Sequence, residues 1–268
     1  MKTNQLTKSP LSYVLAQVRI SPIMNLETFI STLQGSIRKD FPLCNKIQIK
    51  AIEFNQQSEP SVKEMTQWHF ADKLNITGII ADTNTITIHT THYETFDKLI
   101  NKLKIVLDKF NSILEIGLYS RIGIRYINAI HHTPEKYLNK ELLGFHLEKN
   151  SGFKDKFFIK SETIQETNEG LINIKVSHFN AKEIISEKNI LIPQDLMQSA
   201  SYLALDTNNQ AKALSNFAIL DIDHFTEGQE KNKDFNITEI VKKIEKLHEG
   251  IVIAFENSIT PTALEEWK

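Results

Sequence analysis

The sequence is poor in the residues from which the best-known catalytic and binding motifs are built. Cys44 is its only cysteine, which excludes a disulfide within the chain and any zinc or iron–sulfur site made of several cysteines. Its nine glycines form neither a P-loop nor a dinucleotide-binding G-x-G-x-x-G, and the sequence also lacks a G-x-S-x-G elbow and an H-E-x-x-H motif. We therefore expect no cofactor, and none of the mechanisms that depend on these motifs.

The two signs of charge are nearly balanced, because the sequence has 31 Lys and Arg residues and 33 Asp and Glu residues, for a formal net charge of −2. The two signs are interspersed, so the chain as a whole carries no electrostatic footprint for nucleic acid or for an anionic membrane, although a local basic patch stays open. No run approaches the ~20 apolar residues that span a bilayer, and the N-terminus has no uninterrupted apolar segment. We expect a cytoplasmic protein with no membrane partner and no nucleic-acid partner.

What the chain does have is strong hydrophobic periodicity. Apolar residues recur at spacings of three and four over 93–113 and 236–256, which predicts two long amphipathic helices, and a shorter pattern predicts a helix over 26–37. Asn25 and Asn236 stand directly before two of these patterns and are expected to be N-caps. With 268 residues, of which 41% are hydrophobic, the chain can bury one large core or two smaller ones.

Between the helices the period changes to two, which is typical of strands. A short helix is expected near 136–143, and strands are expected at 13–20, 46–54, 65–74, 78–81, 85–91, 119–128, 156–165, 171–179, 201–206 and 217–225. The predicted fold is α+β with two lobes, residues 1–133 and 134–268, each a mainly antiparallel sheet packed against one long amphipathic helix. The lobes could also form one compact unit, and whether they are a duplication stays open.

The segment YSRIGIRYIN, residues 119–128, predicts a strand whose two faces differ in chemistry. Side chains alternate along a strand, so one row is apolar and includes Tyr126, while Arg121 and Arg125 share the opposite row. Asn128 belongs to the core-facing row and is expected to end it as a hydrogen-bonded polar cap.

Two guanidinium groups on one strand face could hold a carboxylate or phosphate through paired donors, and Arg19, at the end of the first strand, joins them only if that strand is a neighbour in the sheet. The structural alternative is that Arg121 and Arg125 pair with Asp or Glu side chains on adjacent strands. These three arginines are the predicted ligand-binding residues.

Asp221, Asp223 and His224 form a D-x-D-H run at the end of a predicted strand and are the candidate metal ligands. Carboxylate oxygens suit hard cations and imidazole suits transition metals, but two carboxylates do not complete a site, and a strand that runs into a polar loop often ends this way. His89 is expected to have a structural role on a sheet face. The terminal Trp267 is expected to dock on the fold and to anchor the C-terminus.

The combination of RIGIRYIN after the YETFDKLINKLKIVLDKF helix with the closing LHEGIVIAFENSITPTALEEW resembles a sporadically distributed family of conserved prokaryotic proteins of about this length. The similarity extends over nearly the whole chain and includes Arg121, Arg125, Asp221 and Trp267. The family has no established activity, so the resemblance transfers no catalytic residue. Its patchy distribution implies, by association, an accessory setting such as a mobile element, a toxin–antitoxin pair or a defence cassette.

Two hypotheses about function follow. In the first, the protein is a non-catalytic binding protein that recognises a partner protein or a small anionic ligand through Arg19, Arg121 and Arg125. In the second, it is an enzyme of unrecognised type that acts on a phosphate- or carboxylate-bearing substrate with an Asp/His/Arg cluster. Convergence of the acids and arginines in one concave pocket would favour the enzyme, whereas pairing of each arginine with a carboxylate would favour the binding protein.

Overall fold

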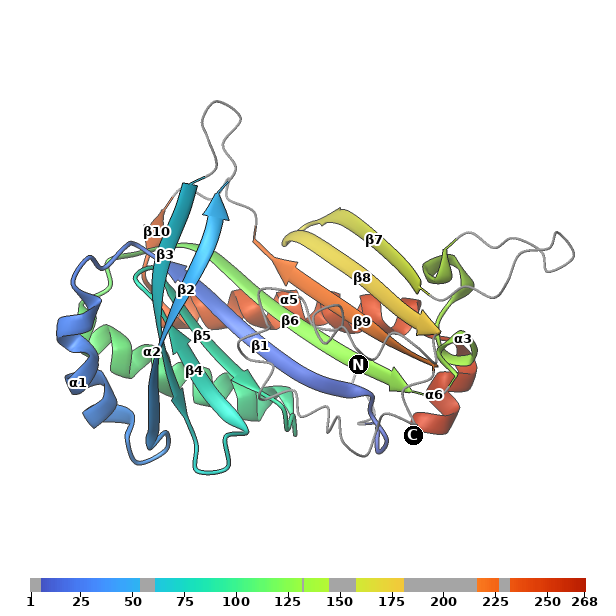
Figure 1. Ribbon diagram of the computed structural model, residues 1–268, viewed down its shortest axis with the longest axis horizontal. Coiled ribbons are helices and arrows are strands. Elements are labelled where there is room, and N and C mark those ends of the chain that lie inside the picture. The colour runs from blue at the N-terminus through green and yellow to red at the C-terminus, as the bar shows by residue number, and fades with distance from the viewer. Residues whose placement is uncertain (1–5, 54–60, 132, 145–157, 181–215, 227–231) are drawn as a thin grey trace, which may run out of the picture. The chain divides into compact units, whose positions relative to one another are not determined.

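The computed structural model of the chain describes residues 6–53, 61–131, 133–144, 158–180, 216–226 and 232–268 (Figure 1). Helices and a large antiparallel sheet make up these ranges, which confirms the expected α+β class. The strand predicted at 201–206 lies outside the described residues.

The chain divides into two compact units that are not consecutive in sequence. Unit 1 comprises Met1–Val14, Ile124–Phe225 and Lys246–Lys268, and unit 2 comprises Leu15–Gly123 and Thr226–Glu245. Strands β1 (Leu11–Ile20) and β6 (Leu118–His131) and helix α5 (Ile237–Ser258) each contribute residues to both units. The units therefore differ from the lobes expected at 1–133 and 134–268, whose independence stays a prediction.

Unit 2 is a sheet in the hydrogen-bonded order β2-β3-β4-β5-β1-β6, with the short strand β10 (Lys233–Asp234) paired to β6. Its other elements are α1 (Leu26–Ile37), β2 (Leu43–Glu53), β3 (Ser61–Ala71), β4 (Thr77–Ala81), β5 (Thr85–Thr90) and α2 (Phe96–Leu114). The turn between β4 and β5 is closed by Asp82, whose carboxylate accepts hydrogen bonds from the backbone of Asn84 and Thr85.

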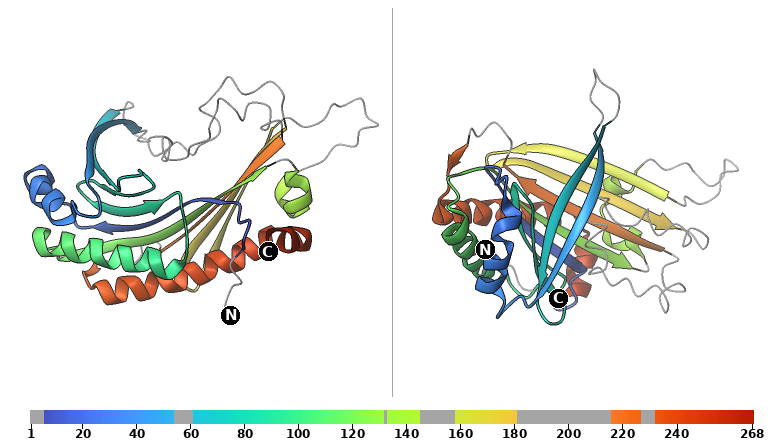
Figure 2. Two further views of the ribbon diagram at one scale, coloured as in Figure 1. Left: turned by 90° about the horizontal axis from the view of Figure 1, so that it is seen from below. Right: turned by 60° about the vertical axis from the view of Figure 1, so that its left-hand side comes forward.

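The core of unit 2 forms because α2 carries its apolar residues on one stripe. The buried stripe contacts β5 and contains Leu99, Ile100, Leu103, Val106, Leu107 and Phe110. On the strands, Phe70, Ile79 and Ile88 are fully enclosed. Figure 2 shows α2 running along one side of these strands.

Unit 1 is a sheet in the order β6-β9-β8-β7. Its elements are α3 (Pro134–Tyr137), a 3-10 turn η1 (Lys140–Leu143), β7 (Phe158–Thr167), β8 (Gly170–Asn180), β9 (Asn216–Phe225) and α6 (Pro261–Trp267). Val176, Leu220 and Ile222 are fully buried, as is Leu247 of α5. The 246–258 part of α5 covers this face, since Nδ1 of His224 lies 2.8 Å from the carbonyl oxygen of Leu247.

The helix ends agree in part with the sequence expectations. The side chain of Asn236 accepts a hydrogen bond from the backbone N–H of Glu239 at 3.2 Å, which confirms that cap. Asn25 occupies the expected N-cap position of α1, but its side chain makes no capping hydrogen bond and its backbone carbonyl accepts from the backbone N–H of Thr28. No helix in the described ranges is long and apolar enough to cross a bilayer.

Candidate functional site

Arg125 of β6 and Asp221 of β9 form a bidentate ion pair inside unit 1. Nε of Arg125 lies 2.7 Å from Oδ1 of Asp221, and Nη2 lies 2.6 Å from Oδ2. Both side chains are buried, with about a tenth or less of each exposed to solvent. Both carboxylate oxygens are thus engaged by the guanidinium, the strongest geometry for such a pair.

The pair lies on the face of the unit 1 sheet that turns away from α5. Tyr126 marks the opposite face, because its hydroxyl is 3.1 Å from Nδ1 of His248 on that helix. Adjacent residues of a strand point to opposite faces, which places the side chain of Arg125 on the far side. Asn128 lies on the core-facing side, where its Nδ2 donates to the carbonyl of Leu220 and its side chain is buried, as expected.

His224 does not join Asp221. Its Nδ1 faces Leu247 of α5, and its Nε2 lies 2.9 Å from the hydroxyl oxygen of Thr167. Gly250 makes room for the ring, since a Cβ at that position would come within 2.4 Å of it. Asp223 shares the face of Asp221 by strand alternation, but among the described residues no three His, Cys, Asp or Glu side chains are grouped to hold a metal ion.

The other two predicted arginines belong to unit 2. Arg121 is half-buried, and its Nη1 donates to the amide oxygen of Gln17 at 3.2 Å. The amide nitrogen of Gln17 donates in turn to the hydroxyl of Thr87. Arg19 is exposed. From the predicted set, the structure therefore brings together Arg125 and Asp221 in unit 1, while Arg19 and Arg121 lie in unit 2.

Two histidines of unit 2 are buried and neutral. His69 of β3 and His89 of β5 are almost completely enclosed, and burial lowers the pKa of His69 to about 4 and that of His89 to about 3. Nearby His69 also lowers the pKa of His89, whereas Asp72 opposes this shift. The structural role expected for His89 agrees with this placement.

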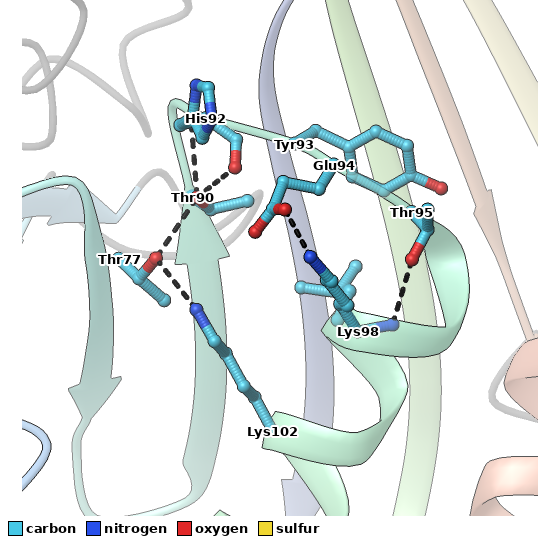
Figure 3. Close-up of a pocket in the computed structure, with 9 residues that line it drawn as sticks. Thr77, Thr90, His92, Tyr93, Glu94, Thr95, Lys98 and Lys102 are labelled. Carbon is cyan, nitrogen blue, oxygen red and sulfur yellow. Dashed lines mark hydrogen bonds and ion pairs between the residues drawn. The ribbon is translucent and has the colours of Figure 1, made fainter. Parts of the chain in front are cut away.

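A polar pocket in unit 2, which the sequence reasoning missed, lies where the first turns of α2 face β4 and β5 (Figure 3). Lys98 and Lys102 reach it from the helix, and the hydroxyls of Thr77 and Thr90 reach it from the strands. We call these four residues the lysine–threonine pocket. The hollow measures about 20 Å³, which is enough for one water-sized group.

Hydrogen bonds hold the walls of this pocket. The hydroxyls of Thr77 and Thr90 are buried and lie 3.2 Å apart, and Nζ of Lys102 donates to Thr77 at 3.4 Å. Lys98 pairs with Glu94, which precedes the N-cap of α2, and this hydrogen bond lowers the pKa of the exposed Glu94 carboxyl. The pocket is thus lined by two lysines and two threonines, with Nζ of Lys102 directed at Thr77 and Nζ of Lys98 directed at Glu94, which also lines it (Figure 3).

One signal in the sequence could have indicated half of this pocket. Lys98 and Lys102 are four residues apart, so they lie on one face of the predicted helix. The other half depends on the pairing of Thr77 with Thr90 across β4 and β5, a register that residue types alone do not reveal.

A scan of the sequence against protein-family models finds no match, and a search of curated proteins finds none.

Proposed function

We propose that this chain is a non-catalytic binding protein and that its lysine–threonine pocket receives an anionic group. The observation that carries the proposal is the convergence of Lys98, Lys102, Thr77 and Thr90 on one hollow (Figure 3). Ammonium groups are donors for carboxylate or phosphate oxygens. The hydroxyl of Thr90 already donates to the carbonyl oxygen of His92, so the lysines supply the charge and the free donors.

The existing contacts of the lysines are easily exchanged for a ligand. The hydrogen bond from Lys102 to Thr77 is long, at 3.4 Å, and therefore weak. Replacing it with a contact to a ligand costs the ammonium group little interaction energy. The pair of Lys98 with Glu94 is solvent-exposed, and exposed ion pairs contribute little to stability. A bound anion would also face the positive end of the 19-residue helix α2.

The hollow accepts only one small group, which limits what such a ligand looks like. A single carboxylate or phosphate oxygen fits, and the rest of the ligand or partner stays outside against exposed Lys98. A carboxylate or phosphate displayed on a partner protein satisfies this requirement as well as a free small molecule does.

The contacts of the predicted polar cluster favour binding over catalysis. Two hydrogen bonds join the guanidinium of Arg125 to the two carboxylate oxygens of Asp221, and His224 packs against α5 on the opposite face of the sheet. A catalytic acid, base or oxyanion donor must meet the substrate, and Asp221 and Arg125 are already used within the fold. The proposal therefore gives them a structural role.

The proposal also covers the domain organisation of the chain and its cellular and genetic setting. We infer two lobes at 1–133 and 134–268, each with one long helix on its sheet, in a cytoplasmic protein of the sporadic prokaryotic family that the RIGIRYIN and LHEGIVIAFENSIT segments resemble. An accessory cassette is the genetic setting consistent with that family.

The test is a calorimetric titration of the purified protein with inorganic phosphate, citrate and a nucleoside monophosphate at low ionic strength. We expect Lys102→Gln to weaken binding of the responsive anion about tenfold or more, because a hydrogen bond to a charged group contributes about 1.5–3 kcal/mol. Lys109→Gln, an exposed lysine on the same helix outside the pocket, is the matched control.

Equal loss of binding in both variants would reduce the effect to general electrostatics and overturn the pocket as the site. Binding that Lys102→Gln leaves unchanged would do the same. If the wild type bound none of the three anions, the proposed anionic ligand class would be excluded and the proposal rejected.

A further inference from the structure

A groove runs between two helices of unit 2, where the second half of α2 lies beside the first half of α5. Figure 2 shows the two helices side by side. The volume of the groove is about 620 Å³, and the residues that form it include Lys104, Asp108, Ile237, Val241, Lys242 and Glu245. We call it the α2–α5 groove. Its aliphatic side chains come from α5, and charged side chains flank them.

The charges of the α2–α5 groove are balanced in sign. Each helix supplies one base and one acid, Lys104 with Asp108 on α2 and Lys242 with Glu245 on α5. Throughout the part of the chain that the structure describes, none of these four side chains forms an ion pair or a side-chain hydrogen bond. Four charged groups around one groove therefore remain available to a partner.

An exposed apolar side chain stands beside the groove. Ile105 follows Lys104 on α2, and 55% of it is exposed. Residues 104, 105 and 108 lie within about 100° of one another around the helix, so Ile105 projects next to the side that forms the groove. A large aliphatic residue and a groove with an aliphatic floor thus share one surface.

We propose that the α2–α5 groove binds the same surface of a second copy of this chain around a two-fold axis. In a two-fold interface one patch meets itself, so a projecting residue and the groove that receives it must both belong to that patch. Ile105 of each copy enters the groove of the other. Lys104 then faces Glu245 of the partner subunit, and Asp108 faces Lys242 of the partner subunit.

The charge pattern selects this occupant over others. A strongly acidic or strongly basic partner would place like charges against two of the four groups, which opposes association. A surface that carries two charges of each sign, one of each on either helix, is complementary to itself when the helices are exchanged. This interface is independent of the lysine–threonine pocket and does not rest on the proposed function.

The test is sedimentation velocity on the full chain over a range of concentrations. The wild type is expected to show a reversible monomer–dimer equilibrium, and Ile105→Glu to raise the dimer dissociation constant at least about tenfold. Ile253→Glu is the matched control, since Ile253 is also on a helix and is 61% exposed but lies outside the groove. Circular dichroism checks that both variants remain folded.

A charge exchange assigns the orientation. Lys104→Glu and Glu245→Lys should each weaken the dimer, and the double variant should recover at least half of the lost association, because the exchanged pair is again of opposite sign. A monomeric wild type, a dimer that Ile105→Glu leaves intact, or equal effects of Ile105→Glu and Ile253→Glu would overturn the proposal. A double variant that shows no recovery would overturn the pairing of α2 with α5.

Discussion

The imidazole of His89 lies directly over Gly78 on the neighbouring strand. A Cβ built on Gly78 would come within 2.6 Å of Nε2 of His89 and within 2.8 Å of the carbonyl oxygen of Phe70. The two residues are register partners in the β4–β5 ladder, and His89 is fully buried. The absent side chain at Gly78 is thus what allows the histidine to occupy the interior.

We predict that Gly78→Ala destabilises the protein, by about 1–3 kcal/mol, because the methyl group collides with backbone and with an enclosed ring. Gly35→Ala is the informative control. Gly35 lies in α1 with nothing within 4 Å of an added Cβ, and alanine there should stabilise by about 0.5–1 kcal/mol. Urea denaturation measures both changes, and a neutral Gly78→Ala would contradict the packing described.

The buried histidines predict that stability falls as the solution is acidified. Burial lowers the pKa of His69 to about 4 and that of His89 to about 3, below their ordinary value of 6.5. Between these values the unfolded chain binds protons that the folded chain does not, so the free energy of unfolding decreases as the pH falls. The stabilising effect is complete above about pH 6.5, is lost progressively as the pH falls toward the folded-state values, and contributes no further change below them.

Between about pH 7.5 and pH 5.5 each histidine should lower the free energy of unfolding by about 1.4 kcal/mol, which is one pKa unit of differential proton binding. The double variant His69→Gln, His89→Gln should be less stable at neutral pH but should lose most of this slope. Urea denaturation at the two pH values provides the comparison. A wild type whose stability is constant over this interval would show that the two rings are not buried as neutral groups.

Substituting one member of the Arg125–Asp221 pair should lower the stability of the protein more than substituting both. Arg125→Met leaves a buried carboxylate without its partner, and Asp221→Leu leaves a buried guanidinium, so each should cost about 3–5 kcal/mol. The double variant removes both charges and should be more stable than either single variant. Chemical denaturation of the four proteins gives the coupling energy, and simple additivity would argue against the bidentate contact.

Local sequence patterns predicted the elements of this fold better than its contacts. The apolar stripe through Leu103 located α2, and the alternation around Arg125 separated the two faces of β6. The same alternation could not show that the guanidinium is already bound, because Asp221 lies 96 residues away and reaches it only through the pairing of β6 with β9. Whether an arginine is available is a property of tertiary structure.

The lysine–threonine pocket and the α2–α5 groove were missed for the same reason. Lys98 is informative only once Thr77 and Thr90 are known to be neighbours, and Lys104 only once α5 is known to lie beside α2. Helix α6 is a different case, since Thr260 followed by Pro261 is a common start of a helix, and the side chain of Thr260 does cap it. That element could have been predicted from the sequence.

Trp267 ends α6 and is predicted to hold the C-terminus onto unit 1. Only 8% of it is exposed, which confirms the expected docking. Its ring lies 5.2 Å from that of Tyr137 on α3 and 6.3 Å from that of Phe255 on α5, and its carbonyl oxygen accepts from the backbone of Lys8 at 3.0 Å. The segment around Lys8 and the helices α3 and α5 thus all contact Trp267, the first through its backbone and the two helices through its ring.

Trp267→Ala should destabilise the protein by about 3–5 kcal/mol, because it removes a large buried ring and leaves a cavity between three elements. Deletion of residues 261–268 should cost at least as much, since it also removes the buried Ala263. Glu265→Ala, an exposed substitution on the same helix, should stay within about 0.5 kcal/mol of the wild type. Thermal and urea denaturation supply the values. If the tryptophan and the glutamate variants proved equally stable, the ring would not be anchoring the chain end, and α6 would have to be held by its backbone contacts alone.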